Sequence, residues 1–366
     1  MAKDIHKKEF DDGTKIKLDI FREYLKEWLP TFTKRKEIIW KDIFIYDFFA
    51  GEGEDIAKNQ GSPLIIIDEL KAHHDAIANN NLNLSLILNE ADEKKYKILK
   101  SKINIYENSV PYKIKPFQKK FSELFNEIYP KIIVDSGNPR LFFLDQYGIK
   151  EINNEVFKKI INLKRTDFIF FISSSYVRRF SEMEEFKSYI KINKTDFIES
   201  KPVHSHRVVF EYYKSLITDK NEYYLAPFSI KKGVNIYGLI FGSNHTLGIE
   251  KFLNIAWKIN PNSGDANFNI DEEAIAEGQM SFFIEDNKPK KLTLFENKLK
   301  ELILNKNLRT NLEVYKFSLD YGCLPKHANV VLNDLIKKGY VKPIRMVSND
   351  IHNLAKNNNI EKIELK

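Results

Sequence analysis

The chain has 366 residues, of which 43% are hydrophobic and 30% charged, values typical of a folded protein with a sizeable core. Its single cysteine, Cys323, excludes a disulfide framework and a cysteine-based metal cluster, and no metal site is expected. No apolar run follows Met1 and no stretch is long enough to span a bilayer, so we expect a cytoplasmic protein without membrane contacts.

Basic residues are concentrated near the end of the chain. The net charge is +7, yet residues 288–366 alone carry 14 lysines and two arginines against eight acidic residues. A local excess of positive charge favours a polyanionic partner such as DNA or RNA for that segment. The alternative is a lysine- and asparagine-rich composition without a binding role.

The first predicted element is a helix. Between residues 15 and 29, apolar side chains recur at helical spacing, and Pro30 ends the pattern. The apolar positions are Ile20, Phe21, Tyr24, Leu25 and Trp28. This helix precedes the first predicted strand, so we expect it to pack beside the loop that follows that strand.

Residues 43–53 combine a β-prone apolar run with an acidic loop of sequence Asp-Phe-Phe-Ala-Gly-Glu-Gly. A strand that is apolar on both faces belongs in the middle of a parallel sheet covered by helices. Gly51 and Gly53 let the backbone turn tightly and approach a ligand without a Cβ atom in the way. We therefore predict the first strand and ligand loop of a doubly wound α/β domain.

The charge of this loop indicates its ligand. Ile56 stands where a dinucleotide-binding loop needs its third glycine, and the sequence contains no P-loop. A phosphate would be repelled by the carboxylates of Asp47, Glu52, Glu54 and Asp55. A cationic nucleoside fits better, so S-adenosylmethionine (SAM) is the predicted cofactor, and the loop resembles the first motif of SAM-dependent methyltransferases. A generic strand–turn–helix is the alternative. The predicted cofactor contacts in the loop are Asp47, Phe49, Ala50, Gly51 and Gly53.

The next elements are a helix and a second strand. Ser62 is a favourable N-cap and Pro63 a favourable first helical residue, so a helix is predicted to run to about residue 78. Glu90 follows the strand at residues 84–88, where doubly wound folds place a carboxylate against ribose hydroxyls. Glu90 is thus a predicted cofactor contact, with a solvated helix-capping glutamate as the alternative. A further helix and a third strand are predicted at residues 92–103 and 112–115.

Residues 141–144 form a strongly apolar predicted strand, which Asp-Gln-Tyr-Gly follows at residues 145–148. Parallel strands share one carboxyl edge, so Asp145 is expected near Asp47. Amino-methyltransferases carry Asp/Asn-Pro-Pro-Tyr/Phe here, where an acceptor orients the target amine and an aromatic ring stacks on the base. A strand-end turn with a structural aspartate is the alternative. The predicted catalytic residues are Asp145, Gln146, Tyr147 and Gly148.

The remaining pattern completes one domain and begins another. A fifth strand at residues 167–172 and an antiparallel pair complete a doubly wound, Rossmann-like methyltransferase sheet of the α/β class. The antiparallel pair is predicted at residues 223–228 and 235–241, and a helix at 247–259. The predicted organisation is a Rossmann domain at residues 1–265, a linker at 266–290 and a smaller C-terminal domain at 291–366.

The C-terminal domain is predicted to be a winged helix. Three short helices, the third beginning near Pro325, precede a β-wing at residues 339–346. Winged helices bind nucleic acids and also dock proteins, so both roles stay open. The predicted nucleic-acid contacts are Lys326, Asn329, Asn333, Lys342 and Arg345.

Four stretches together carry a family resemblance: the helix at residues 17–28, the loop at 47–53, Gly-Ser-Pro at 61–63 and the strand end at 143–148. With the winged helix, they resemble the three-Cys-motif partner family (TcmP) over most of the chain. The resemblance implies a SAM-methyltransferase-like domain, often encoded beside a three-cysteine, radical-SAM-like protein. Gln146 replaces the proline of the family's usual Asp-Pro-Phe/Tyr-Gly.

Two functions follow from these predictions. The first is an enzyme that methylates an amino group of nucleic acid, with the winged helix holding the polyanion. The second is a non-catalytic adaptor that docks nucleic acid or the three-cysteine partner protein. C5-cytosine methylation is excluded because it needs a cysteine nucleophile in the catalytic domain, and Cys323 lies in the C-terminal domain.

Overall fold

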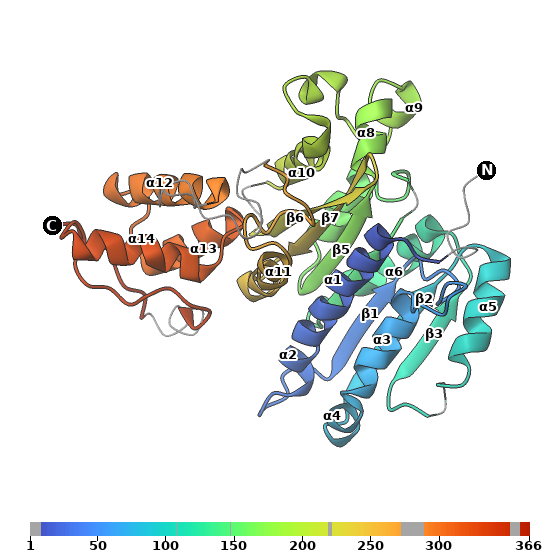
Figure 1. Ribbon diagram of the computed structural model, residues 1–366. Coiled ribbons are helices and arrows are strands. Elements are labelled where there is room, and N and C mark those ends of the chain that lie inside the picture. Colours follow the sequence, from blue (N-terminus) through green and yellow to red (C-terminus); the bar gives the residue numbers. More distant parts are fainter. Residues whose placement is uncertain (1–8, 108, 147, 219–221, 272–288, 352–358) are drawn as a thin grey trace. The chain divides into compact units, whose positions relative to one another are not determined.

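The computed structural model describes residues 9–107, 109–146, 148–218, 222–271, 289–351 and 359–366 (Figure 1). The chain divides into two compact units, Met1–Gly248 and Ile249–Lys366. The division falls inside helix α11 (Thr246–Ile259). Most of α11 therefore belongs to the second unit, whereas the sequence analysis assigned this helix to the first domain.

A seven-stranded sheet organises the first unit, in the order β3-β2-β1-β4-β5-β7-β6. Strands β1 to β5 are parallel, and β7 runs antiparallel to both β5 and β6. The strand order reverses between β1 and β4, which is where doubly wound sheets bind their ligands. The predicted doubly wound α/β sheet is thus confirmed. The strands are β1 (Asp42–Asp47), β2 (Asn83–Asn89), β3 (Lys113–Phe117), β4 (Arg140–Leu144), β5 (Thr166–Ile172), β6 (Tyr224–Lys232) and β7 (Asn235–Ser243).

The central strands are apolar on both faces because side chains pack against both. On β4, Phe142 makes edge contacts with Tyr46 and Phe48 on one face of the sheet. Phe143 points to the opposite face and stacks on Phe21 of the first helix, with ring centroids 4.0 Å apart. Both β4 rings are fully buried. This two-sided burial explains why the strand lacks the polar–apolar alternation of a half-exposed strand.

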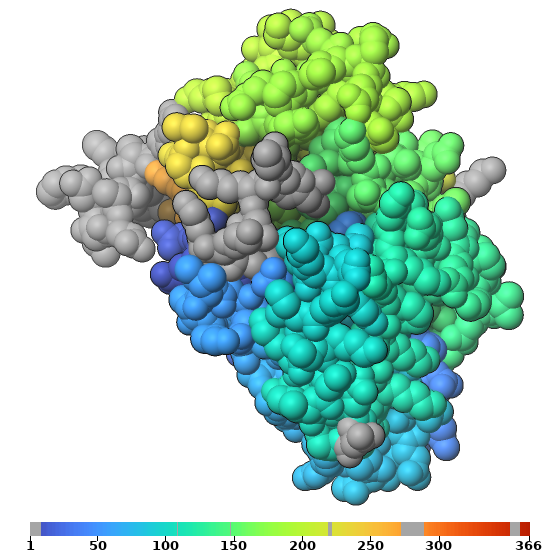
Figure 2. All heavy atoms as spheres, turned by 90° about the vertical axis from the view of Figure 1, so that its right-hand side faces the viewer, coloured from blue at the N-terminus to red at the C-terminus, as the bar shows by residue number. Residues whose placement is uncertain are grey.

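Helices surround this sheet. Helix α1 packs beside α3, and α10 packs against β6 and β7. Helices α8, α9 and α10 follow β5 and gather at the end of the sheet where β5 finishes (Figure 1), and their residues form the yellow-green upper part of the surface in Figure 2. The α-helices are α1 (Asp12–Trp28), α2 (Pro30–Thr33), α3 (Ser62–Lys71), α4 (His74–Asn79), α5 (Glu93–Ile103), α6 (Phe121–Val134), α7 (Asn154–Ile161), α8 (Ser174–Phe180), α9 (Glu184–Lys187) and α10 (Ser205–Ser215).

The predicted helices are confirmed with two corrections. Helix α1 agrees with its predicted range and begins after Asp11, whose carboxylate accepts the Thr14 amide. The prediction of a single helix from Ser62 to residue 78 is wrong, because the chain turns at residues 72–73 and forms two helices, α3 and α4. Gly61 rather than Ser62 is the N-cap, so Ser62 is the first helical residue.

The second unit is helical. Its core is formed by apolar side chains of the three helices, among them Phe295, Leu299, Leu319, Leu332 and Leu335. A capping box starts α13, because the Thr310 hydroxyl accepts the Glu313 amide and the Glu313 carboxylate accepts the Thr310 amide. Besides most of α11, the described helices of this unit are α12 (Lys290–Leu304), α13 (Asn311–Asp320) and α14 (Pro325–Lys337).

The last residues of the chain pair with two other segments of the second unit. The Ile363 amide donates to the Arg309 carbonyl at 2.7 Å, and the Lys342 amide donates to the Glu364 carbonyl at 2.9 Å. Isolated bridges join Thr310 to Lys362 and Val341 to Leu365. The C-terminal segment therefore pairs both with the residues before α13 and with those after α14. The described residues 342–351 form no strand, so the predicted wing strand through residue 346 is absent there.

Within the described part of the chain, no helix combines the length and the apolar character needed to cross a membrane.

Candidate cofactor and acceptor site

The loop after β1 has the tight backbone that its glycines predicted. Gly51 and Gly53 adopt positive φ angles of 62° and 88°, a region that disfavours other residues. The Gly61 amide donates to the Gly53 carbonyl at 2.7 Å. A Cβ atom on Gly61 would lie 3.1 Å from that oxygen, so a glycine allows this close approach. The contact holds the loop against the start of α3.

Asp47, the last residue of β1, has a fully buried side chain. Its Oδ1 accepts the Phe49 amide at 3.2 Å, while Oδ2 completes no hydrogen bond within the described structure. Burial raises the pKa of Asp47 to about 7, the Ser62 side chain and the Phe49 amide oppose this rise, and the nearby charges of Asp145 and Glu90 add to it. A buried carboxylate oxygen without a partner favours a cationic or N–H donor ligand.

Glu90 connects the loop to the end of β2. Its Oε2 accepts the Gly51 amide at 3.0 Å, and its Oε1 accepts the Asp92 amide at 2.8 Å. The Ala50 amide donates to the Asn89 carbonyl at 2.9 Å, which adds a second connection. A carboxylate has about four acceptor positions, so Glu90 keeps capacity for ligand hydroxyls. Its structural role in holding the loop was not part of the sequence prediction.

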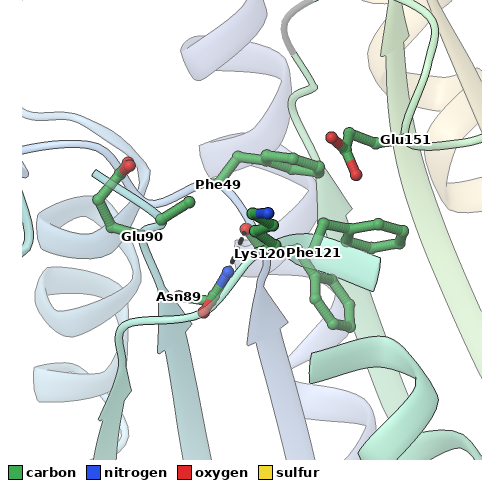
Figure 3. A pocket seen from close by; sticks show the side chains of 8 residues that line it. Phe49, Asn89, Glu90, Lys120, Phe121 and Glu151 are labelled. Atoms are coloured by element: carbon green, nitrogen blue, oxygen red, sulfur yellow. Dashed lines mark hydrogen bonds between the residues drawn. The ribbon is translucent and has the colours of Figure 1, made fainter. Parts of the chain in front are cut away.

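A cavity of about 100 Å³ opens between the loop and the ends of β2 and β3 (Figure 3). The rings of Phe49 and Phe121 stack at its wall, with centroids 5.3 Å apart. Ligand pockets usually measure about 300–1,000 Å³, so this cavity accommodates one ring of a ligand and not a complete nucleoside. The lining residues are Phe48, Phe49, Asn89, Glu90, Ala91, Lys120, Phe121 and Glu151.

Asn89 shapes the floor of this cavity. Its side-chain amide donates to the carbonyls of Phe48 and Lys119, at 3.2 and 3.0 Å (the first is drawn in Figure 3). Its Oδ1 accepts the Lys119 amide at 3.2 Å. No residue was predicted from the sequence to contact the adenine of the cofactor. Phe121 and Lys120 follow the third predicted strand, and this position was the sequence feature that could have identified them.

Asp145 follows β4 and forms an ion pair with Lys17 of α1. The two side chains are 19% and 6% exposed, so this is a largely buried pair. The Lys17 ammonium also lies 4.5 Å from the centroid of the Phe171 ring, near the end of β5. Lys17 is not among the site residues predicted from the sequence. Its position on the apolar face of a helix, three residues before Ile20, was the signal that could have identified it.

Gln146 stabilises the turn after Asp145. Its Oε1 accepts the amides of Glu151 and Ile152, at 3.2 and 3.0 Å. The residue is 3% exposed, and its Nε2 has no hydrogen-bond partner in the described structure. The side chain thus fixes a turn at the position where the resembling family has a proline. Gly148 has a φ of 87°, and Tyr147 lies outside the described residues.

The protein residues predicted to contact nucleic acid lie on α14 and in the segment after it, in the second unit. Lys326 and Asn333 are exposed, as are Lys342 and Arg345. Asn329 is different, because its side chain exchanges two hydrogen bonds of 2.9 Å with the Val347 backbone. Its amide therefore holds the segment after α14 in place. Lys342 forms an exposed ion pair with Glu364 at 2.6 Å.

Comparison with known proteins gives a fold-level result. No family model matches the chain, and no curated protein matches it. Among solved structures, Trm1 from Pyrococcus horikoshii with S-adenosyl-L-methionine is 10% identical, with 66% of this chain and 59% of that chain covered and a TM-score of 0.36. TYW2 from P. horikoshii in complex with MeSAdo is 12% identical, with 66% and 65% covered and a TM-score of 0.31. Geranyl diphosphate methyltransferase in complex with SAM is 9% identical, with 64% and 92% covered and a TM-score of 0.28.

The chain thus spans less than two thirds of the length of Trm1 and of TYW2. The fold assignment comes from the strand order: parallel β3-β2-β1-β4-β5 followed by an antiparallel β7 and then β6 form a Rossmann-like methyltransferase sheet. The first unit therefore has the fold of class I SAM-dependent methyltransferases. The absence of a matching family model leaves the resemblance to TcmP a prediction.

Proposed function

We propose that the protein is a SAM-dependent methyltransferase that acts on an amino group. The observation that carries this proposal is the buried Asp47, whose Oδ2 has no hydrogen-bond partner in the described structure and whose pKa is raised by burial and further by the charges of Asp145 and Glu90. These carboxylates stand at the ends of β1, β2 and β4, neighbouring strands at the ligand-binding edge of the sheet. An acidic site of this kind suits a cationic nucleoside with an amino-acid end.

The site residues fit SAM chemically. Asp47 has the open acceptor that the ligand's ammonium group requires, and Glu90 has acceptor capacity for the ribose hydroxyls. The stacked pair of Phe49 and Phe121 offers an aromatic wall for the adenine ring. Because the cavity beside these rings is small, we expect the loop or the segment around Lys120 to move when the ligand enters.

Asp145 has the chemistry of the acceptor site. When bound, SAM supplies a methyl group that an acceptor lone pair takes as the carbon–sulfur bond breaks, with the bonding electrons left on sulfur. Asp145 accepts a hydrogen bond from the target N–H, orients the lone pair and takes the proton that the nitrogen loses. Gln146 supports this role because its side chain fixes the turn that presents Asp145.

Nucleic acid is the proposed substrate because of the charge of the C-terminal segment. Residues 288–366 have an excess of lysine and arginine over acidic residues, and exposed Lys326 lies on α14. We propose that α12 to α14 and the paired C-terminal segment act as a winged helix with α14 as its recognition helix. The bridges from residues 362 and 365 to the segments before α13 and after α14 support this reading.

A second candidate function is a non-catalytic adaptor. The observation that favours it is the Lys17–Asp145 ion pair, which already occupies one oxygen of the carboxylate that the enzyme would use. In this reading the methyltransferase fold and the second unit dock nucleic acid or, as the family resemblance implies, a three-cysteine radical-SAM-like protein.

One assay distinguishes the two functions. Purified protein is incubated with labelled SAM and the total nucleic acid of a host that lacks the gene, with DNA and RNA digested separately afterwards. The enzyme reading predicts label in N-methylated nucleosides of one of the two pools. SAM binding without transfer to any pool would instead support the adaptor.

A further inference from the structure

The Lys17–Asp145 ion pair places a positive charge at the proposed acceptor site. Lys17 is 5% exposed and belongs to α1, so its ammonium is held by the helix that covers this side of the sheet. One oxygen of Asp145 accepts a hydrogen bond from this ammonium, and the centroid of the Phe171 ring lies 4.5 Å from the ammonium nitrogen. The contacts of Lys17 with Asp145 and with Phe171 are both made within the protein itself.

This arrangement has a consequence for the charge of the acceptor. Methyltransferase acceptors with amino groups fall into two classes: alkylamines, which are protonated near pH 7, and conjugated amines, which are neutral. The Lys17 ammonium already compensates the charge of Asp145, so a second cation beside this largely buried pair would lose its hydration without a net attraction from the pair. A neutral N–H donor avoids this cost and needs only the second oxygen of Asp145.

We propose, on the basis of the proposed function, that Lys17 determines acceptor specificity: it restricts methyl transfer to neutral conjugated amines, and the substrate is the exocyclic amino group of a nucleobase. Lys17 also positions Asp145, because it fixes one carboxylate oxygen and leaves the other for the acceptor. Lysine side chains and N-terminal amines of proteins are excluded as acceptors because their protonated forms would lose hydration at this compensated pair.

The test compares two acceptor pools with labelled SAM at pH 7.5: total DNA and RNA in one, poly-L-lysine and total host protein in the other. Wild type is expected to label nucleosides and no lysine. Lys17→Met is expected to lower kcat on the nucleic acid by about 10²-fold, as for a misplaced catalytic group. Its affinity for SAM should stay within a few fold, and Lys17→Arg should recover most of the loss.

Two controls separate this role from a general loss of structure. Lys15→Met changes a lysine of the same helix that is 41% exposed and paired with Glu9, and it should behave as wild type. Lys17→Met combined with Asp145→Asn removes both charges, so it should fold and bind SAM even if the single variant does not. The wild-type comparison of pools needs no variant.

Three outcomes overturn the proposal. Label on lysine or another protein amine in wild type would contradict the exclusion of cations. Equal kcat for Lys17→Met and wild type on nucleic acid would contradict the positioning role while leaving the methyltransferase function intact. Absence of transfer to every pool by wild type would remove the proposed function and this inference with it.

Discussion

The carboxylates of Asp47, Glu90 and Asp145 stand at the ends of three neighbouring strands and meet three different environments. Asp145 is neutralised by Lys17, and Glu90 is held by the amides of Gly51 and Asp92. Asp47 accepts one backbone amide and forms no ion pair within the described residues, so burial dominates its ionisation. We infer that the three carboxylates have two different roles. Asp47 and Glu90 bind the cofactor, and Asp145 binds the methyl acceptor.

The raised pKa of Asp47 makes the ligand-free protein less stable as the pH rises. Its folded-state pKa of about 7 exceeds the ordinary value of 3.8, so its contribution to stability is full below pH 3.8 and is lost as the pH rises through 7. A change of this size corresponds to roughly 4 kcal/mol. Asp47→Asn should therefore be more stable than wild type at pH 8 and similar to it at pH 4. Urea unfolding at both pH values measures this.

Asp75→Asn is the matched control for this experiment, because Asp75 is exposed on α4. It should change neither unfolding curve by more than a few tenths of a kcal/mol. If the free energy of unfolding of Asp47→Asn exceeds that of wild type by the same amount at pH 4 and pH 8, the pKa of Asp47 in the folded protein is not raised to about 7.

Asp145→Asn should reduce methyl transfer much more than SAM binding. Asparagine keeps the shape of the side chain and one acceptor oxygen but cannot take a proton or balance the Lys17 charge. We expect kcat to fall by about 10²–10⁴-fold, the range for removal of an acid–base or electrostatic group, and the Kd for SAM to change by a few fold. Equal transfer by the variant and wild type would remove Asp145 from catalysis.

At the scale of elements, the loop after β1 depends on its glycines and on its contact with α3. Gly51 has a φ of 62°, and a β-branched side chain strongly disfavours that conformation. Gly51→Val should distort the loop, break the hydrogen bond to Glu90 and abolish SAM binding, while the sheet stays folded. Circular dichroism and calorimetry with SAM would measure both effects.

Gly137→Val is the matched control, because a Cβ atom at Gly137 would meet nothing within 4 Å. It should bind SAM as wild type does. If Gly51→Val also binds SAM with wild-type affinity, the loop is not the cofactor site.

The elements that the sequence predicted best are those with strong apolar patterns. The apolar runs at β1, β2 and β4 predicted a central parallel sheet, and the glycines after β1 predicted a tight loop at its carboxyl edge. Features that depend on contacts between residues far apart in the sequence could not be predicted. Helical periodicity marked α1 as amphipathic but does not distinguish a buried lysine with a distant partner, so Lys17 and its pairing with Asp145 were missed. The break between α3 and α4 has no proline or glycine to mark it.

At the scale of the whole molecule, the chain combines a methyltransferase sheet in one unit with a helical second unit. The basic segment belongs to the second unit, whereas the proposed acidic ligand site belongs to the first. This separation of charge is what we expect if one unit binds a cationic cofactor and the other binds a polyanion.

Nucleic-acid binding by the full chain should therefore depend on salt and on the second unit. Lys326→Glu with Lys342→Glu is expected to weaken binding to duplex DNA or structured RNA. In a plot of the logarithm of the binding constant against the logarithm of the salt concentration, the slope should also decrease in magnitude by about one for each phosphate that the variant no longer neutralises. Lys94→Glu with Lys100→Glu makes the same charge change on exposed positions of α5 and should have little effect. Equal weakening by the two double variants would assign binding to net charge alone.

Binding of SAM to the 366-residue protein is the measurement on which the proposed cofactor site depends. Isothermal calorimetry of wild type and Gly51→Val, with unfolding measured at saturating ligand, gives the answer without knowledge of the substrate. We predict one site per wild-type chain, loss of that site in Gly51→Val, and a stabilisation of wild type of about 2.7 kcal/mol at a hundredfold excess over Kd. Wild-type protein that gives neither binding heat nor stabilisation at millimolar SAM would show that the acidic site of the first unit does not bind this cofactor.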